Sequence, residues 1–228
     1  MVIEGNGNVS GTGRPTRKAR LKAKHPERYA EIVRVATRLF STDGYGSANV
    51  NRVAAEVGVG VGTLYSHFDD KDDLFLACVE EAAATDLRVK EERIDKHAPA
   101  LEMVRAIMRV DRELHQLDPD GQQLLKSVFY GINSHLEVAK AAQAMYLGSI
   151  QLVTQALTKG IEEGVFDLRG DVVVAALLLT GLMETFHVLG GLLGETNTNG
   201  RPHPADRALT LLCEGILARP AATNKETP

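Results

Sequence analysis

The sequence predicts an all-α protein in which a short three-helix domain precedes a larger helical domain. Apolar residues recur at intervals of three and four along most of the chain, which is the spacing of one face of a helix. No segment alternates apolar and polar residues as a half-buried strand does. Glycine and proline interrupt the helical pattern at several points, and these breaks divide the chain into helices.

The first predicted helix begins at Pro26 and is followed by a clear stop signal. Proline suits the first helical turn, because that turn leaves its amide groups unpaired in any case. The dipeptide Asp43-Gly44 ends the helical pattern. Between these points, one helical stripe holds the apolar residues Tyr29, Ile32, Val33, Ala36, Leu39 and Phe40.

A second, shorter helix is predicted immediately afterwards. Asn49 is a good N-cap, because its side-chain oxygen can accept a hydrogen bond from a free amide group of the first turn. Gly58 ends the helix. One face about two turns long then carries the residues Val50, Val53, Ala54 and Val57.

A third helix must follow at once, because Leu64 and Phe68 are four residues apart. The pair Asp69-Asp70 is then suited to cap a fourth helix that starts near Lys71. Short helices separated by a glycine-containing turn form a helix-turn-helix. We therefore expect this motif at 49–68.

The rest of the chain stays helical in pattern, with breaks near 98–99, 118–119, 164–170 and 195–204. The segment 172–194 is nearly all apolar and long enough to cross a bilayer, but Glu184, His187 and four glycines argue against a membrane helix. In a soluble protein such a helix needs cover on every side, which a partner subunit can supply. A final helix at about 205–217 can join the same contact through Ala208, Leu209, Leu212 and Ile216.

Composition is that of an ordinary folded protein, with 44% apolar and 25% charged residues. Cys78 and Cys213 are far apart and fit neither a metal site nor a disulfide framework, so we expect reduced core residues. The first fifteen residues contain no apolar run of the signal-peptide type. We therefore expect the protein to work in the cytoplasm.

Charge is distributed unevenly along the chain. The segment 14–71 carries eleven Lys or Arg against six Asp or Glu, a net charge of +5, which leaves −9 on the remainder of a chain whose total is −4. A basic segment in an acidic protein favours a polyanion partner for that segment, because its cations displace the counterions of phosphates. The alternative is a basic face that only contacts solvent.

A specific pattern of residues runs through the first three predicted helices and into the start of the fourth. It comprises Ala36, Leu39, Phe40, Gly44, Tyr45, Val53, Ala54, Val57, Gly58 and Val59, then the run Gly62-Thr63-Leu64-Tyr65-Ser66-His67-Phe68, and finally Lys71 and Leu74. With this spacing, the segment 28–74 closely resembles the DNA-binding domain of the TetR family of bacterial regulators. The resemblance covers about a fifth of the chain, and the rest agrees with the family in length and helical character.

The resemblance implies a regulator that binds double-stranded DNA. In similar proteins, helices four to seven or eight enclose a pocket for a small-molecule inducer, and the last two helices form a four-helix bundle with a second subunit. It therefore implies a homodimer on a palindromic operator, with repression as the commoner mode. We expect a disordered basic arm at 1–24, the helix-turn-helix domain at 25–70, a helical ligand-binding and dimerisation domain at 71–218, and a disordered tail at 219–228.

The candidate DNA-binding residues follow from the orientation of the third helix. Leu64 and Phe68 should face inward, which leaves four other residues of the helix on or near its outer face. Hydroxyl and imidazole groups there can donate to phosphate oxygens, and a lysine at the next helix start adds a full charge. Tyr65 and His67 have the alternative of packing, and Lys71 of plain solvation. The predicted DNA-binding residues are Arg17, Lys18, Arg20, Asn49, Arg52, Val61, Thr63, Tyr65, His67 and Lys71.

The segment also departs from the family pattern. Gly60 stands where a capping Ser is usual, Val61 where a polar or basic residue often lies, and Ala48-Asn49 where two hydroxyl residues are common. Val61 can contact a thymine methyl group but cannot make a bidentate contact to guanine. We therefore expect specificity to depend on Arg52, on the basic arm in the minor groove, or on DNA deformability.

The predicted inducer site is a mostly apolar set of residues with a few polar groups, as small-molecule sites require. Each member has ordinary core packing as its alternative. Glu184 and His187 lie on one helix face, but a metal site in a helical bundle needs further ligands, and His115 and His135 are scattered. We expect no metal and no cofactor. The candidates are Met103, Ile107, Phe129, Tyr130, Met145, Tyr146, Glu184 and His187.

Three other classes of protein are alternatives to a ligand-controlled regulator. An enzyme would need a nucleophile, a base or a cofactor motif, and the sequence contains no phosphate-binding glycine loop and no His pair with metal spacing. A thiol-based redox sensor would need a reactive Cys78. An architectural DNA binder would bind DNA regardless of any metabolite. We expect a regulator that is not an enzyme, a repressor that leaves its operator when a small apolar or amphipathic ligand binds.

Overall fold

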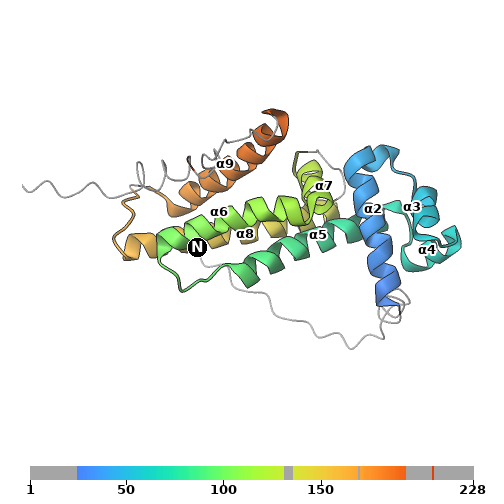
Figure 1. The fold of residues 1–228 in the computed structure, drawn as a ribbon, viewed down its shortest axis with the longest axis horizontal. Helices are drawn as coiled ribbons and strands as arrows, with labels where there is room; N and C mark the ends of the chain where they lie inside the picture. Colours follow the sequence, from blue (N-terminus) through green and yellow to red (C-terminus); the bar gives the residue numbers. More distant parts are fainter. Residues whose placement is uncertain (1–24, 131–135, 169, 194–206, 208–228) are drawn as a thin grey trace, which may run out of the picture.

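The structure, a computed structural model, describes residues 25–130, 136–168, 170–193 and 207. For residues 130, 136 and 186–193 it describes the backbone only. The described part of the chain contains eight α-helices in an elongated arrangement (Figure 1). They are α2 (Pro26–Ser47), α3 (Val50–Val57), α4 (Val61–His67), α5 (Lys71–Arg93), α6 (Ala100–Leu117), α7 (Pro119–Tyr130), α8 (Leu136–Glu162) and α9 (Val172–Leu193).

The start and stop signals of the first helices lie where the sequence predicts them, with one difference. The side chain of Asn49 caps α3 by accepting a hydrogen bond from the amide of Asn51 at 2.9 Å. Gly58 ends α3 in the left-handed conformation, with φ 73°. Gly44 also has a positive φ, of 75°, but α2 resumes after this kink and continues to Ser47.

Helix α5 runs from the domain of α2 to α4 into the larger helical part of the molecule (Figure 1). It begins at a cap in which Asp70 accepts a hydrogen bond from the amide of Asp73 at 2.8 Å, as the Asp69-Asp70 pair predicts. Along its 23 residues it packs first on α2 and α7 and then on α6 and α8. Helix α5 therefore packs on helices of both predicted domains.

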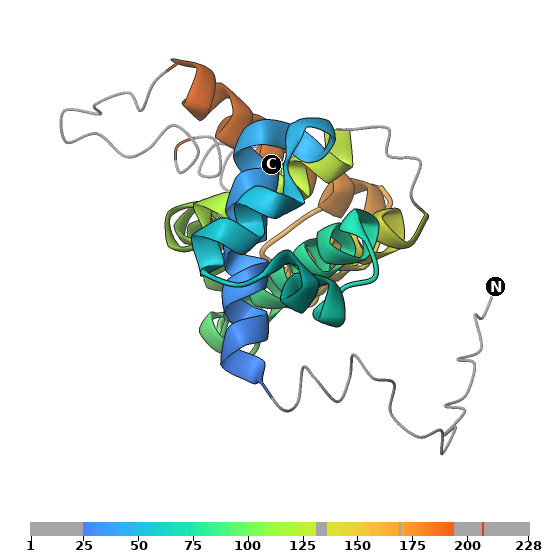
Figure 2. The same cartoon turned by 90° about the vertical axis from the view of Figure 1, so that its right-hand side faces the viewer.

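The predicted DNA-reading domain comprises α2, α3 and α4 and sits at one end of the molecule (Figure 1). There, α3 and α4 lie beside α2 (Figure 2). An aromatic cluster ties this domain to α5, because the Phe75 ring lies 4.9 Å from the ring centroids of both Phe40 and Tyr45. The Tyr45 hydroxyl also donates to Asp72 in the first turn of α5. The two parts share one apolar core around this junction.

Helix α9 has one packed face and one open face. Ala176, Leu179 and Met183 are buried against the helical body, whereas residues on the opposite side are exposed. Among the described residues, no helix combines the length and the apolar character that a bilayer crossing requires. The exposed apolar residues of this helix are Val173, Val174, Leu177 and Leu178.

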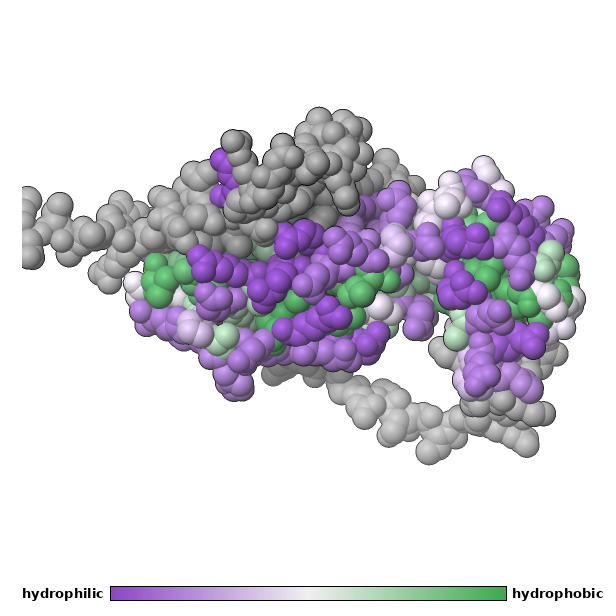
Figure 3. Space-filling view, viewed as in Figure 1, coloured by the Kyte–Doolittle hydropathy of each residue, from purple (hydrophilic) through white to green (hydrophobic). Residues whose placement is uncertain are grey.

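The view in Figure 3 shows a mostly hydrophilic surface on the described helices, interrupted by apolar patches. The predicted breaks at 98–99, 118–119 and 164–170 fall between helices. The predicted arm at 1–24, the last helix at 205–217, the tail and Cys213 lie outside the described residues, apart from Arg207.

Candidate DNA interface and effector cavity

The short helix α4 is anchored by apolar side chains on one face, as predicted. Leu64 is fully buried and Phe68, just after the helix, is 2% exposed. The opposite face leaves Thr63 exposed and Tyr65 43% exposed. These two hydroxyl groups are therefore available to phosphate oxygens.

His67 lies on the other side from the one predicted. It is only 5% exposed, because the last turn of α4 turns its ring toward α2, where the ring centroid of Tyr29 lies 6.3 Å away. Burial lowers the pKa of His67, and the nearby charges of His25 and Arg28 add to this effect. Its Nδ1 atom is buried without a hydrogen-bond partner among the described residues. The packing alternative therefore describes this side chain better than an outward position.

Val61 and Lys71 each have a structural role beside the predicted one. Val61 is half-buried and packs against the core of the DNA-reading domain. The Lys71 ammonium donates to the carbonyl of Gly46 at 3.2 Å and lies 4.8 Å from the centre of the Tyr45 ring. Lys71 is thus held at the junction of α2 and α5 rather than being freely solvated.

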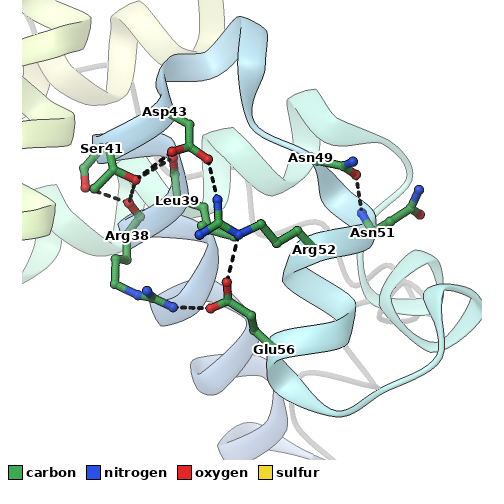
Figure 4. A network of polar contacts seen from close by, with 9 residues as sticks. Arg38, Leu39, Ser41, Asp43, Asn49, Asn51, Arg52 and Glu56 are labelled. Atoms are coloured by element: carbon green, nitrogen blue, oxygen red, sulfur yellow. Dashed lines mark hydrogen bonds and ion pairs between the residues drawn. The ribbon is translucent and has the colours of Figure 1, made fainter.

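Arg52 is part of an exposed ionic network between α2 and α3 (Figure 4). Its guanidinium lies 2.9 Å from a carboxylate oxygen of Asp43 and 3.0 Å from one of Glu56. Arg38 pairs with the same glutamate, and its hydrogen bond is the largest factor that lowers the pKa of Glu56. Exposed pairs of this kind contribute little to stability, so phosphates can displace these carboxylates at little cost.

Of the other predicted DNA-binding residues, Asn49 is exposed and serves as the α3 cap. Arg17, Lys18 and Arg20 lie outside the described residues. On the DNA-reading end, the structure therefore brings Arg52, Thr63 and Tyr65 to the surface and assigns packing or capping contacts to the remaining described candidates.

A cavity lies among α5, α6, α7, α8 and α9. The volume open to the centre of a water molecule is about 20 Å³, which is room for about one water. Its wall combines apolar and charged side chains from all five helices. The lining residues are Asp86, Lys90, Ile107, Asp111, Gln122, Leu125, Lys126, Met145, Tyr146, Ser149, Leu152, Val153, Thr180, Met183 and Glu184.

Half of the predicted inducer-site residues meet at this cavity: Ile107, Met145, Tyr146 and Glu184 line its wall. Two others do not. Met103 is buried in the core and does not line the wall. Phe129 is 54% exposed, and its ring centroid lies 4.3 Å from that of Tyr146 with the two rings tilted by 37°. The side chains of Tyr130 and His187 lie outside the described set.

The cavity wall contains a buried ionic cluster that the sequence did not reveal. The Lys90 ammonium lies 2.7 Å from Asp86 and 3.4 Å from Asp111, and it donates to the Ser149 hydroxyl at 3.0 Å. Gln122 donates to the second carboxylate oxygen of Asp86 at 3.2 Å. Residues from four helices, α5 to α8, therefore form one polar cluster around Lys90 and Asp86.

Burial and charge oppose one another at Lys90. Burial by itself lowers the pKa of this lysine, but the carboxylates of Asp111 and Asp86 outweigh it and raise the pKa above its usual value. The ammonium is therefore charged at neutral pH, and its side chain is only 6% exposed. For Lys126, on another wall, burial prevails over the attraction of Glu184 and Asp111 and lowers the pKa.

A signal for this cluster does exist in the sequence. On α5, Asp86 and Lys90 continue the buried stripe of Cys78, Val79 and Ala82. Charged residues on a stripe that is otherwise apolar indicate a buried pair. What the sequence lacks is the identity of the partners on α6, α7 and α8.

The thiol of Cys78 is fully buried between α5 and α2, with its sulfur 3.6 Å from the Val33 carbonyl oxygen. Burial raises the pKa of this thiol to about 12, against a small opposing hydrogen bond from Thr37. Thiolate is the reactive form, so this environment disfavours redox sensing at Cys78. Among the described residues, no cluster of three or more His, Cys, Asp or Glu side chains is placed to hold a metal ion.

Comparison with known proteins agrees with this arrangement. Residues 32–78 match the family model described as "Bacterial regulatory proteins, tetR family". The chain is 24% identical over 164 residues to the fatty acid metabolism regulator protein of Bacillus subtilis, covering 72% of this chain and 83% of the relative. It is 32% identical over 109 residues to an HTH-type transcriptional regulator of Staphylococcus aureus, but these are 47% of this chain and 56% of that protein.

Solved structures share the fold. A putative transcriptional regulator from Saccharomonospora viridis in complex with choline superposes with a TM-score of 0.73 at 19% identity, covering 86% of this chain and all of the other. The regulator FadR of Bacillus subtilis in complex with stearoyl-CoA has a TM-score of 0.67 at 22% identity, covering 82% and 99%. The likeness in fold extends through the larger helical part, beyond the segment that the family model matches.

Proposed function

Because this chain belongs to the TetR family of bacterial regulatory proteins and is a DNA-binding transcriptional regulator, we propose that it is a repressor that binds a palindromic operator as a homodimer. A small apolar or amphipathic ligand enters the cavity and releases the repressor from DNA. The observation that carries the proposal is helix α5, which begins beside the DNA-reading helices and lines the cavity with Asp86 and Lys90.

The DNA contacts in this proposal come from α3, α4 and the basic arm. Thr63 and Tyr65 donate to phosphates, and Arg52 exchanges its carboxylate partners for phosphate oxygens. The arm residues Arg17, Lys18 and Arg20 add sequence-independent attraction. The remaining contributors in the proposal are Asn49, Val61, His67 and Lys71, of which His67 acts chiefly by holding α4 on α2.

The homodimer is supported by the open face of α9. Val173, Val174, Leu177 and Leu178 repeat at helical spacing and form an exposed apolar stripe, with Leu178 70% exposed. An exposed contiguous apolar surface of this kind marks a protein contact. In a twofold dimer the same stripe from both subunits is buried, and the two α4 helices are presented to successive major grooves about 34 to 36 Å apart.

Ligand control in this proposal depends on the distance between the two α4 helices of the dimer. A ligand larger than the present cavity must push the surrounding helices apart, and α5 carries part of that displacement to the DNA-reading domain. A small tilt at each α5 spoils the match of the two α4 helices to the grooves. The small-molecule ligands in the titles of the similar structures, choline and stearoyl-CoA, support ligand control without identifying the ligand of this chain.

The test begins with a duplex selected by the full-length protein from a random library. The proposal expects the selected sequence to be palindromic, one dimer to bind each duplex, and the logarithm of affinity to fall steeply against the logarithm of salt concentration, by about 0.9 for each phosphate contact. A reporter promoter carrying the duplex should be silenced by the protein. A monomeric complex would contradict the homodimer, and a flat salt response would contradict the phosphate contacts. Activation of the reporter would contradict repression.

A matched pair of variants tests the dimer contact. Leu178→Glu places a charge on the exposed stripe of α9, whereas Leu117→Glu places one at an equally open site, 58% exposed, at the end of α6. The first variant should sediment as a monomer and lose operator affinity, and the second should remain a dimer. Dimers from both variants would place the subunit contact elsewhere.

A further inference from the structure

An open groove lies between α2, α5 and the junction of α6 with α7. The volume open to the centre of a water molecule is about 550 Å³, against about 20 Å³ in the cavity among α5 to α9. Its apolar wall residues include Tyr29, Val33, Ala82 and Leu117, the last of which is 58% exposed. This groove, called the α2–α5 groove below, therefore has room for several side chains.

Carboxylates outnumber cations on the wall of the α2–α5 groove. Glu81 of α5 lines it, together with Asp118, between α6 and α7, and Asp120 in the first turn of α7. The wall contains one cation, the exposed Arg34 of α2. With every group ionised, these four side chains carry a net charge of −2.

The three carboxylates have no ion-pair partner within the described part of the chain, and their other contacts are neutral. Asp118 accepts a hydrogen bond from the amide of Gly121 at 3.1 Å. Asp120 accepts one from the hydroxyl of Ser41 at 3.0 Å. These contacts leave both negative charges in place, so a cation that enters the groove gains charge-assisted hydrogen bonds.

Two groups of the groove wall respond to the negative charge around them. The pKa of Asp118 is raised, chiefly by burial, and nearby carboxylates, Asp120 and Glu81 among them, add to that rise. Burial raises the pKa of Tyr29 to about 12, with contributions from the charges of Glu80 and Glu81. The carboxylates thus disfavour further negative charge in the groove and favour positive charge.

The segment of chain that precedes α2 carries the complementary charge. Residues 14–24 lie outside the described residues and include six Lys or Arg and no Asp or Glu. Pro26, at the start of α2, itself lines the groove, whose α2 wall extends to residue 37, about 17 Å along the helix. Eleven extended residues span about 36 Å. The segment is therefore long enough to turn back at Pro26 and follow the groove.

From this combination of position, length and charge, we propose that the basic segment 14–24 docks in the α2–α5 groove of its own chain when no DNA is bound. Its cations pair with Glu81, Asp118 and Asp120, and DNA phosphates compete with these carboxylates. Docking lowers the affinity for DNA of any sequence, because the arm must leave the groove before it contacts phosphates. The inference goes beyond the proposed function and takes from it only the contribution of the arm to DNA binding.

Cleavage of the full-length protein by trypsin tests the docking without DNA. Trypsin cuts after Lys and Arg, so the segment 14–24 offers several sites, and mass spectrometry follows their loss with time. The cleavage rate reports the undocked fraction of the arm. The double variant Glu81→Gln with Asp118→Asn should therefore be cut at these sites at least about threefold faster than the wild type.

Two further variants separate docking from damage to the fold. Glu81→Gln alone should also accelerate cleavage, and its side chain is exposed, so its loss leaves the core untouched. Glu91→Gln is the matched control, because Glu91 is exposed on the same helix but does not line the groove. The control should be cut at the wild-type rate, and all variants should keep the wild-type melting temperature.

A double-mutant cycle tests the competition with DNA. Affinity for a duplex of arbitrary sequence is measured by anisotropy, with the native arm and with an arm in which Arg17, Lys18 and Arg20 are replaced by Gln. With the native arm, the double variant of Glu81 and Asp118 should bind at least about threefold more tightly than the wild type. With the neutral arm, the same groove substitutions should leave the affinity unchanged.

The outcomes judge the docking separately from the proposed function. Wild-type cleavage rates in the groove variants would overturn it. A gain in DNA affinity that persists with the neutral arm would reflect overall charge and would also overturn it. Protection from trypsin that rises with protein concentration would place the arm of another copy in the groove and contradict docking within one chain. None of these results depends on the operator sequence or on release by a ligand.

Discussion

The DNA-reading end and the effector half of this protein bury different kinds of residue. Around α3 and α4 the interior is almost entirely apolar, and its charged side chains form exposed networks such as that of Arg52. Along α5 to α8 the interior contains the cluster of Asp86, Lys90 and Asp111, each less than 9% exposed. The first region depends chiefly on apolar packing, and the second combines packing with buried charge.

This difference has a functional meaning. An apolar core tolerates no second arrangement of comparable energy without loss of packing, which suits a domain that must present α4 rigidly. A buried ionic cluster depends on partners from several helices and is sensitive to any charge that enters beside it. In the proposed function, the region that responds to a ligand is thus the one whose interior carries charge.

The largest expected effect comes from removing the lysine at the centre of the cluster. Lys90→Met leaves Asp86 and Asp111 buried without their cation, and we expect the free energy of unfolding to fall by about 3–5 kcal/mol, measured by urea denaturation. Arg88→Met on the same helix breaks an exposed pair with Glu92 and should cost less than about 1 kcal/mol. Equal losses in both variants would contradict a special role for the buried cluster.

An intermediate effect is expected at the DNA-reading end. Tyr65→Phe removes an exposed hydroxyl, so operator affinity should fall about tenfold while the melting temperature stays unchanged. Tyr45→Phe is the control, because the Tyr45 hydroxyl donates to Asp72 inside the protein and its loss should lower stability instead. Unchanged operator affinity in Tyr65→Phe would remove this residue from the interface.

The smallest effect concerns pH. Because burial lowers the pKa of His67 in the folded state, the unfolded state binds the proton more readily, and stability is lost as pH falls below the unfolded value of about 6.5. The slope from this one group cannot exceed about 1.4 kcal/mol per pH unit. His67→Asn should flatten the stability curve between pH 7.5 and pH 5.5, and identical curves for both proteins would contradict the buried neutral histidine.

The DNA-reading end was largely predictable from the sequence because its contacts are local. The caps at Asn49 and Asp70, the stop at Gly58 and the inward face of Leu64 and Phe68 all follow from residues a few positions apart. His67 was misplaced because its position depends on Tyr29 of α2, which lies more than thirty residues earlier in the chain. Helical spacing alone does not specify which neighbour covers the last turn of a short helix.

The effector half was predictable only in part. Apolar character identified Ile107, Met145 and Tyr146 as wall residues, but it also selected Met103, which belongs to the core. The ionic cluster was missed because its partners lie on other helices, although Asp86 and Lys90 continue the buried stripe of α5. Buried charge is a property of the assembled helices, whereas a capping residue or a helical stripe is a property of one segment.

The central claim is that α5 couples the cavity to the DNA-reading helices, and coupling is reciprocal. The most direct measurement is the affinity of a small apolar or amphipathic probe that binds the cavity, compared between the free protein and the protein on its selected operator. The account predicts weaker binding to the complex, by the same factor by which the probe lowers operator affinity. Equal affinities for the free protein and the complex would contradict it.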